Sequence, residues 1–432
     1  MTFKKRFADS SLAVFLAFLL VYLLTLTSNF TGPHDSMAYL EMLQNKDRLW
    51  HPHHLIYHKL SYLWLHLLKP VFPDTADYFL VESFGSLFGA ATLSIVFLFF
   101  RRRFLLPVAA SWLGTAIVGF SYGIWFYSVN VEVYAPSLLF TMWTLYVATR
   151  KNWSAKDVWL AALLQSVAIL FHQMNILITP VVIYKIYEQR KNIYVLKSIF
   201  WYGLTGLVIV GGAYFITGWI LSGHNSFDGW IGWIKGYTST GQYWRGLNLK
   251  TPALAGIGFS HTIFGGHFIF EMGLQNELST LLSTHELQDE AFLVRHMSTS
   301  TGTVLFIFAS VIAMCILFML VNLFGRVRFL VRNQYHIVIP LLIYFGVTSF
   351  YFLFWMPEIL EFWLGQCIVF WMLLIGGFQP QGRRFNILLL AVAVMLFSVN
   401  YFSSIRPMQN IKNDIGYERI QKVRSLATEK DL

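Results

Sequence analysis

A small set of ionisable side chains in this 432-residue chain lies in loops or at the ends of predicted helices, where it could take part in chemistry. Asp35 follows His34 in a Gly-Pro turn, and an aspartate can accept a proton from a reacting hydroxyl group. A second reading remains open, because an aspartate at this position can also cap the helix predicted to follow it. The two roles are compatible, since a carboxylate at a helix start is held in a defined orientation.

Histidines cluster soon after Asp35, at His51, His53, His54 and His58. Imidazole nitrogens are common zinc ligands, so these residues and Asp35 could hold a metal ion. However, the sequence contains no HExxH motif or other specific ligand spacing. We therefore predict that the protein uses no cofactor, with a divalent metal ion in the first loop as the alternative.

Further polar residues occur near the predicted ends of later helices. A solvated helix end is one interpretation of Glu132, but Trp125, Tyr127 and Tyr134 flank it, as in a carboxylate that binds or positions a sugar. His172 precedes Asn175 in a tight turn and is either a functional or a hydrogen-bonded buried histidine. Glu361 lies after a helix-breaking proline, where it could contact sugar hydroxyls or pair with an arginine.

The composition indicates a membrane protein. Hydrophobic residues make up 56% of the chain and charged residues 12%, whereas soluble domains are about one quarter charged. In a membrane protein, an excess of lysine and arginine indicates which loops face the cytoplasm. We therefore attribute the net charge of +10 to topology and expect no nucleic-acid partner. The two cysteines, Cys315 and Cys367, lie in apolar runs, which excludes a disulfide framework or a CxxC site.

Hydropathy predicts an all-α polytopic membrane protein with about eleven transmembrane helices of roughly twenty residues each. The predicted spans are 12–26, 78–100, 104–122, 131–148, 158–171, 174–187, 198–221, 303–324, 336–355, 362–378 and 385–402. Segment 254–273 is semi-apolar but contains His261, His267 and Glu271, so we interpret it as re-entrant or interfacial. Residues 55–71 are predicted to form an amphipathic helix on the membrane surface.

Positive charges place the N-terminus in the cytoplasm. Lysines and arginines cluster at 4–6, 101–103, 150–156, 185–197, 326–332 and 383–384, and all these connections fall on one side of the predicted topology. The opposite side contains the long segments 29–77 and 222–302 and every candidate residue named above. This arrangement predicts a single outward-facing cleft, roofed by 222–302.

The predicted organisation has four parts. Residues 1–221 form a transmembrane module whose first outer loop is 29–77, and 222–302 form an outer-face segment. Residues 303–403 are the C-terminal transmembrane helices, and 404–432 form an amphipathic tail. The tail's Ile405, Met408, Ile411, Ile415 and Ile420 fit a helix on the membrane interface.

Three motifs resemble those of one known family, in order as well as in type. They are Asp35-Ser36, His51-Pro52-His53 and Val131-Glu132-Val133-Tyr134-Ala135. Over roughly the first 190 residues the chain resembles the GT-C superfamily of multispanning glycosyltransferases, in particular its protein O-mannosyltransferase-like branch. It departs from that pattern at Met37-Ala38, where the family has Gly-Glu, and at His53, where it has a second proline.

The resemblance implies transfer of a sugar from a polyprenyl-phosphate carrier to a hydroxyl group on the extracytoplasmic face, with inversion. The acceptor would be a protein, a lipid or a polysaccharide. Asp35 would be the general base, and Arg245, Lys235, Lys250 and the first-loop histidines would be candidates for the leaving phosphate. His34, Glu132, Tyr134, His172, Asn175 and Glu361 would complete the substrate site. The expected location is a bacterial or archaeal plasma (inner) membrane.

Three other functions remain open at this point. A transporter or flippase would use the outer polar residues as a substrate path, but would favour charges near mid-span. A membrane O-acyltransferase could use His172, which would leave Asp35 without a role. A non-catalytic GT-C-like subunit would explain why the acidic residue expected at Met37-Ala38 is missing.

Overall fold

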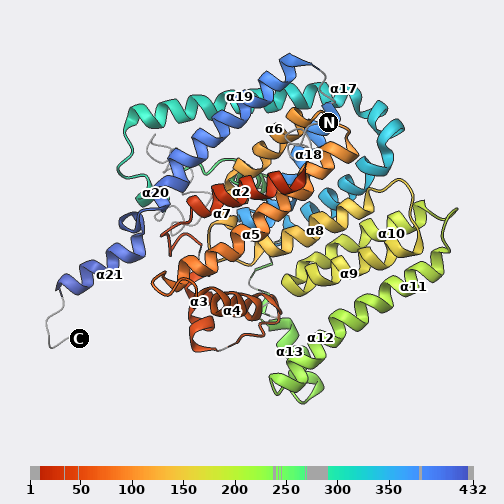
Figure 1. Ribbon diagram of the computed structural model, residues 1–432, viewed down its shortest axis with the longest axis horizontal. Coiled ribbons are helices and arrows are strands. Elements are labelled where there is room, and N and C mark those ends of the chain that lie inside the picture. The colour runs from red at the N-terminus through yellow and green to blue at the C-terminus, as the bar shows by residue number, and fades with distance from the viewer. Residues whose placement is uncertain are drawn as a thin grey trace.

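The computed structural model is helical throughout the residues that it describes (Figure 1). These residues are 10–33, 35–46, 48–236, 240, 241, 243, 244, 246–267, 269, 290–378 and 382–426. Within them, the extended pairing consists of two isolated bridges, His51 with His54 and Trp244 with Trp355. The prediction of an all-helical chain is therefore confirmed for the described residues.

The first half of the chain supplies the centre of the bundle and one polar end. Its helices are α2 (Ser11–Leu24), α3 (Ser36–Asn45), α4 (Tyr57–Leu68), α5 (Asp77–Leu98), α6 (Val108–Phe120), α7 (Tyr122–Ser128), α8 (Tyr134–Ala148), α9 (Ala155–Phe171) and α10 (Thr179–Glu188). A π-helical turn, Phe99–Arg103, extends α5, and the 3₁₀ turn Gln173–Ile178 joins α9 to α10.

The second half wraps around this centre. Its elements are α11 (Val195–Gly206), the mixed π and α stretch Leu207–Leu221 that includes α12 (Gly212–Tyr214), α13 (Phe227–Lys235), α14 (Thr251–Ile263), α17 (Thr299–Phe352), a 3₁₀ turn (Leu360–Trp363), α18 (Leu364–Phe378), α19 (Arg383–Asn400), a π turn (Tyr401–Ile405), α20 (Arg406–Met408), a 3₁₀ turn (Ile411–Asn413) and α21 (Ile415–Leu426).

Fewer helices are long enough to cross a membrane than hydropathy predicts. By length and composition, five helices of the described chain qualify, or six if the bent pair α6–α7 forms one span. The other predicted spans correspond to helices that are shorter than predicted or that begin and end at different residues. For example, α2 has 14 residues, and the predicted spans 303–324 and 336–355 belong to α17, which kinks at Gln334. The structure thus supports a polytopic membrane-type bundle, and the count of eleven is not reproduced.

The predicted span 104–122 is also interrupted. Helix α6 ends at Phe120, Ser121 is extended, and α7 leaves at an angle of 72° to α6. The side chain of Trp371 in α18 donates a hydrogen bond to Ser121 Oγ over 3.0 Å, which holds this corner inside the bundle. The bend directs α7 toward the loop that contains Glu132.

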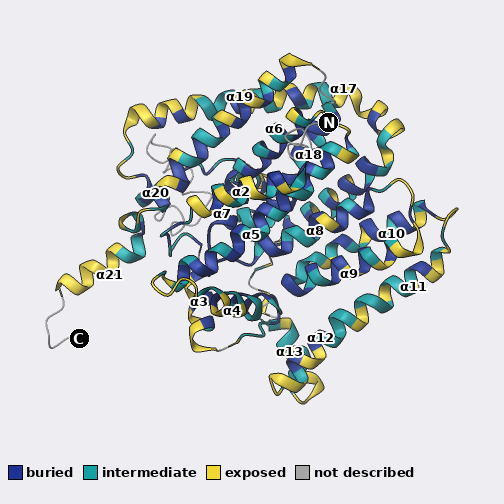
Figure 2. Cartoon of the chain, viewed as in Figure 1, coloured by how far each residue is buried: buried dark blue, intermediate teal, exposed yellow. Residues whose placement is uncertain are grey.

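Burial distinguishes the central helices from the outer ones (Figure 2). Helices α5, α8 and α18 are buried along most of their length, whereas α11 and the first half of α17 expose large apolar side chains such as Leu196, Phe318 and Phe324. Exposed apolar helices of this length are typical of surfaces that face lipid. The apolar core lies between α2, α5, α6, α8 and α18.

Basic residues from three of the predicted cytoplasmic connections meet at one end of this bundle. Arg103 donates hydrogen bonds to the carbonyl oxygen of Tyr146 over 2.8 Å and to Thr149 Oγ1 over 3.2 Å. It also lies within electrostatic range of Arg150 and Lys185. The first loop and the start of α8 lie at the opposite end, so the polar candidates and these basic residues are separated by the length of the helices.

The C-terminal tail begins inside the bundle and then contacts the first loop. Ile405 and Met408 are buried, so the prediction that they lie on the membrane interface is wrong. The buried carboxylate of Asp414 accepts hydrogen bonds from the backbone N–H groups of Phe30 and Thr31, each over 2.7 Å. The start of the tail therefore lies at the same end as the first loop.

Candidate functional site

Asp35 is exposed at the start of α3, and its carboxylate is oriented by a tyrosine. It occupies the N-cap position, but its side chain makes no capping hydrogen bond, so the capping interpretation is wrong. Instead, Asp35 Oδ2 accepts a hydrogen bond from the Tyr39 hydroxyl group over 3.0 Å. Burial, followed by the nearby Glu132 and Asp35, raises the pKa of Tyr39, so this hydroxyl group keeps its proton and acts as a donor.

Two further carboxylates approach Asp35 from distant parts of the chain. Glu132 is buried in the loop between α7 and α8, and Glu361 lies in the 3₁₀ turn before α18. Glu361 Oε2 accepts a hydrogen bond from the Tyr127 hydroxyl group over 3.1 Å. Glu132 Oε2 accepts a weaker one from the backbone N–H of Val133 over 3.3 Å. Glu132 also lies within electrostatic range of both Glu361 and Asp35, so the structure brings these three predicted site residues together.

The proximity of these carboxylates changes their proton affinity. Burial raises the pKa of Glu132 well above its usual value, and the charges of Glu361 and Asp35 raise this pKa further. A buried carboxyl group beside two others retains its proton, because adjacent like charges repel. Glu132 can therefore donate a hydrogen bond, while the exposed Asp35 can accept one.

Aromatic rings connect the carboxylates to the histidines of the first loop. The Tyr134 ring lies 5.0 Å from that of Tyr127 and 5.4 Å from that of His172, between centroids. The His172 ring in turn lies 4.8 Å from His54. The predicted residues Tyr134, His172 and His54 thus belong to the same site as the carboxylates.

The first-loop histidines form a compact group whose rings face one another. His51 and His54 are stacked with centroids 5.6 Å apart, and His51 and His53 are 5.5 Å apart. Burial is the main cause that lowers the pKa of His51 and of His53 to about 4, so these imidazoles are neutral near pH 7. They can donate hydrogen bonds, but they contribute no positive charge.

Several imidazole nitrogens in this group are available to a ligand. Among the described residues, the buried atoms without a hydrogen-bond partner include Nδ1 of His51, Nδ1 of His54 and both ring nitrogens of His58. Buried polar groups are usually satisfied, so such a concentration indicates a place where a polar ligand or water completes the bonding. The Tyr39 ring lies 4.8 Å from that of His58, which places this group beside Asp35 as well.

Contacts with later segments fix the position of the histidine loop. Gln173 donates hydrogen bonds to the backbone carbonyl groups of Pro52, over 2.9 Å, and His53, over 3.2 Å. Tyr214 also donates to the carbonyl oxygen of Pro52. The His53 ring hydrogen bonds to the backbone of Lys235, at the end of α13. The segment that follows residue 222 therefore contacts the first loop near Lys235.

Asn175 has a positioning role. Its amide group donates hydrogen bonds to Ser137 Oγ over 2.7 Å and to the carbonyl oxygens of His172 and Ala168, and it accepts one from Thr141. These bonds fix the turn that presents His172. The remaining predicted site residues, His34 and Arg245, lie outside the described residues, as does Glu271.

Two cavities adjoin the carboxylates, and Glu361 lines both. The larger, of about 270 Å³, is bounded by Gly32, Tyr127, Glu358 and Glu361 among others. The smaller, of about 60 Å³, is lined by Tyr134, His172 and Asn175. A third cavity, of about 590 Å³, is a mostly apolar groove between α9, the stretch 202–214 and α13. Gln173, which contacts the histidine loop, also lines this groove.

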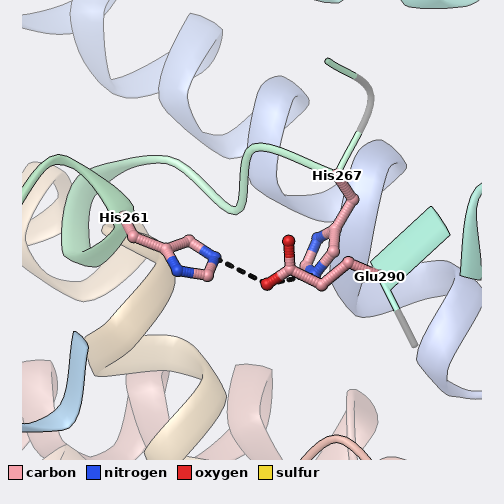
Figure 3. A group of neighbouring side chains, drawn as sticks. All are labelled: His261, His267 and Glu290. Carbon is pink, nitrogen blue, oxygen red and sulfur yellow. Dashed lines mark ion pairs between the residues drawn. The ribbon is translucent and has the colours of Figure 1, made fainter. Parts of the chain in front are cut away.

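Sequence reasoning missed one group of residues at the larger cavity. His261, His267 and Glu290 lie together there, with their side chains pointing toward one another (Figure 3). Two of them were visible as histidines that interrupt the semi-apolar segment 254–273. Glu290 carries no comparable sequence signal, and its distance of 23 residues from His267 hides the relationship.

Residues 63–194 are similar to the N-terminal domain of the protein O-mannosyl-transferase TMEM260. The matched region contains Glu132, Tyr134, His172 and Asn175, and it begins after Asp35 and the first-loop histidines. It covers about a third of the chain. No curated protein matches the sequence.

Proposed function

We propose that the protein is a membrane glycosyltransferase of the GT-C type, which transfers a sugar from a polyprenyl-phosphate donor to an acceptor hydroxyl group. The observation that carries the proposal is the exposed carboxylate of Asp35, oriented by Tyr39 beside the buried Glu132 and Glu361. The similarity of residues 63–194 to a domain of a protein O-mannosyl-transferase supports the same reaction class.

The proposed reaction is a single displacement with inversion at the anomeric carbon. The acceptor oxygen attacks this carbon, and the bond between the carbon and the phosphate oxygen breaks. The proton of the acceptor hydroxyl group moves to Asp35, whose Oδ2 is already held by Tyr39. The electron pair of the broken bond leaves with the lipid phosphate, which needs no general acid because it is a good leaving group.

The other two carboxyl groups are suited to binding the sugar. Glu132 retains its proton and can donate a hydrogen bond to a sugar oxygen, whereas Glu361 accepts a hydrogen bond from Tyr127. Different environments therefore give three neighbouring carboxyl groups different roles. Tyr127, Tyr134 and His172 provide the rings that pack against the sugar.

The donor lipid fits the apolar groove of about 590 Å³. The groove is lined by Leu207, Val210 and Trp230, and Gln173 connects its wall to Pro52 in the histidine loop. A polyprenyl chain in this groove would place its phosphate near His51, His53 and His54. Neutral imidazoles stabilise the departing phosphate by donating hydrogen bonds, with Lys235, Lys250 and Arg245 as the cationic candidates.

The finer topology belongs to the same proposal. A multi-pass arrangement, with the N-terminus in the cytoplasm and the site on the extracytoplasmic face of a plasma (inner) membrane, follows from the distribution of lysine and arginine. The separation of Arg103, Arg150 and Lys185 from the carboxylates supports this orientation. The acceptor is a protein, a lipid or a polysaccharide.

The deciding experiment measures transfer of radiolabelled sugar from a panel of polyprenyl-phosphate sugars by the purified protein, with a membrane extract as the acceptor source. Asp35→Asn should abolish transfer while donor binding persists, because the variant keeps the shape of the side chain but loses the base. Asp74→Asn, which removes another exposed aspartate from the same end of the molecule, should leave transfer unchanged. Full activity of Asp35→Asn would refute the assignment of the base.

Tyr39→Phe separates orientation from proton transfer. It keeps the ring that contacts His58 and removes only the hydroxyl group that holds Asp35. We expect kcat to fall by about tenfold with KM unchanged, the size of one lost charge-assisted hydrogen bond.

If no donor in the panel is used by folded wild-type protein, the reaction class itself is wrong, and a transporter or non-catalytic subunit becomes the working hypothesis.

A further inference from the structure

His261, His267 and Glu290 bring three potential metal ligands together at the 270 Å³ cavity. His261 is in the last turn of α14, His267 lies four residues after the end of that helix, and Glu290 begins the next described segment. Their ligand atoms all lie within 4.8 Å of one another. Figure 3 shows the carboxylate of Glu290 between the two rings.

The spacing of these atoms fits a small tetrahedral ion. Glu290 Oε1 lies 3.4 Å from His261 Nε2 and 3.8 Å from His267 Nε2. Ligands at about 2.0 to 2.1 Å from a tetrahedral zinc ion are about 3.3 Å from one another, so small side-chain movements would complete the geometry. Two imidazoles and one carboxylate are also a ligand set that zinc uses in sites with an open fourth position.

The other nitrogen of the His267 ring is already engaged, as is usual for metal-binding histidines. Nδ1 of His267 is 2.6 Å from Ser404 Oγ. Such partners fix the orientation and tautomer of metal-binding histidines. In contrast, Nε2 of His261 is buried and makes no hydrogen bond among the described residues. This nitrogen points toward Glu290 and is left for a ligand.

The surroundings leave room for a fourth ligand. The His261 ring stacks on Tyr122, with centroids 5.3 Å apart, which closes one side of the group. The other side opens into the cavity that Glu358 and Glu361 also line. An ion held there would have one coordination position directed at the same space as the proposed sugar site.

We propose that His261, His267 and Glu290 bind one divalent transition-metal ion, zinc by the chemistry of these ligands, with an exchangeable fourth position facing the cavity. The ion joins α14, the segment that starts at Glu290 and, through Ser404, the C-terminal helices. The fourth position accepts water or an oxygen atom of a bound substrate. This binding proposal is independent of the proposed transfer reaction, because metal content can be measured without any substrate.

Metal content of the full-length protein is the first test. The protein is purified in detergent through a tag that carries no metal, stripped with chelator, incubated with zinc and desalted before elemental analysis. We expect about one zinc ion per chain, with nitrogen and oxygen ligands at about 2.0 to 2.1 Å in X-ray absorption spectra, including the scattering pattern of imidazole. Metal content no higher than in buffer-matched controls would overturn the proposal.

Variants then locate the ion. His261→Ala and Glu290→Gln should each lose the bound zinc, whereas His296→Gln should retain it, because His296 is exposed and is not part of the group. Ser404→Ala keeps all three ligands and should weaken zinc binding by roughly ten- to a hundredfold, since it removes only the partner of His267. This variant keeps the test valid if a ligand variant fails to fold.

Two results would refute the assignment. Zinc retained by folded His261→Ala and Glu290→Gln would show that the ion binds elsewhere, and its loss in His51→Gln would place it at the first-loop histidines. The transfer assay is scored separately. Stoichiometric zinc without transfer would leave the metal site standing and remove the proposed function. Transfer by a protein that binds no zinc after incubation with it would remove the metal site and leave the proposed function standing.

Discussion

The hydroxyl group of Tyr127 donates a hydrogen bond to Glu361 Oε2 over 3.1 Å, across 234 residues of sequence. This bond connects the bent helix α7 to the turn that precedes α18, and so fixes Glu361 between two cavities. The bend at Ser121 is what directs α7 toward this turn. A corner inside the bundle therefore determines where one carboxylate of the candidate site lies.

Tyr127→Phe should reduce sugar transfer by roughly ten- to a hundredfold, because a hydrogen bond to a charged acceptor contributes about 1.5 to 3 kcal/mol. The phenyl ring still packs against Tyr134, so the variant should fold, with the midpoint of thermal unfolding lowered by the loss of this one hydrogen bond. Steady-state kinetics with the matched control Tyr187→Phe, an exposed tyrosine near the basic end, would check this. Unchanged kcat and KM would remove Tyr127 and Glu361 from the substrate site.

Glu132→Gln should make the protein more stable at high pH. The pKa of Glu132 is raised in the folded protein, so its contribution to stability is fully present below its unfolded pKa of about 4.3 and is lost as pH rises through the folded pKa. Glutamine does not ionise and avoids this loss. The thermal midpoint of the variant should therefore exceed that of wild type by a margin that grows with pH.

The same substitution tests the proposed role of Glu132 in transfer. If the protonated form binds the sugar, wild-type activity falls at high pH as Glu132 ionises, and Glu132→Gln removes that fall while lowering the maximal rate. Rate profiles from pH 5 to 9 would show this. A fall at high pH that persists in Glu132→Gln would assign it to another group.

The neutral histidines of the first loop lead to the opposite dependence of stability on pH. Burial lowers the pKa of His51 to about 4, below the unfolded value of about 6.5. Between these values the unfolded chain binds more protons than the folded one, so stability falls as pH drops through this window. His51→Gln should lose less stability than wild type between pH 7 and pH 5. Equal losses in both proteins would show that His51 is not buried as a neutral ring.

The sequence predicts which end of the bundle holds the site better than it predicts the hydrogen bonds within the site. Positive charges in alternate connections are enough to predict that Asp35, Glu132 and Glu361 share one end, because each helix reverses the chain direction. Hydrogen bonds such as Tyr39 to Asp35 and Tyr127 to Glu361 cannot be derived in this way. They depend on the register of one helix against another, which hydropathy does not determine.

The count of spans failed for a related reason. The hydropathy rule assumes straight helices that cross lipid alone, whereas α8 and α10 have 15 and 10 residues and end in turns that other segments cover. Gln165 illustrates this, because its amide group donates to the carbonyl oxygen of Asn175 and to Thr179, which satisfies the turn before α10. Irregular backbone is tolerated at membrane depth when protein surrounds it.

The group of His261, His267 and Glu290 was missed because two segments distant from the first loop form it.

Asp414 provides a test of whether the tail positions the first loop. Its carboxylate is buried and accepts hydrogen bonds from the N–H groups of Phe30 and Thr31, each over 2.7 Å, and its other oxygen accepts one from Tyr417. Asp414→Ala leaves these loop donors without their acceptor, at a cost of about 1 to 3 kcal/mol for each donor that stays buried. We therefore expect hydrogen exchange in residues 28–36 to accelerate by at least tenfold, with the central helices α5 and α8 unchanged.

The functional consequence follows from the short distance along the chain between Thr31 and Asp35. A loosened loop holds the general base in fewer productive orientations, so Asp414→Ala should lower kcat without weakening donor binding in the groove of 590 Å³. Glu418→Gln is the matched control, because Glu418 is exposed on α21, the helix that follows Asp414, and lies 3.8 Å from Arg295. If exchange accelerates in the loop while kcat stays at the wild-type value, the tail only stabilises the first loop, and Asp35 keeps its orientation through Tyr39 alone.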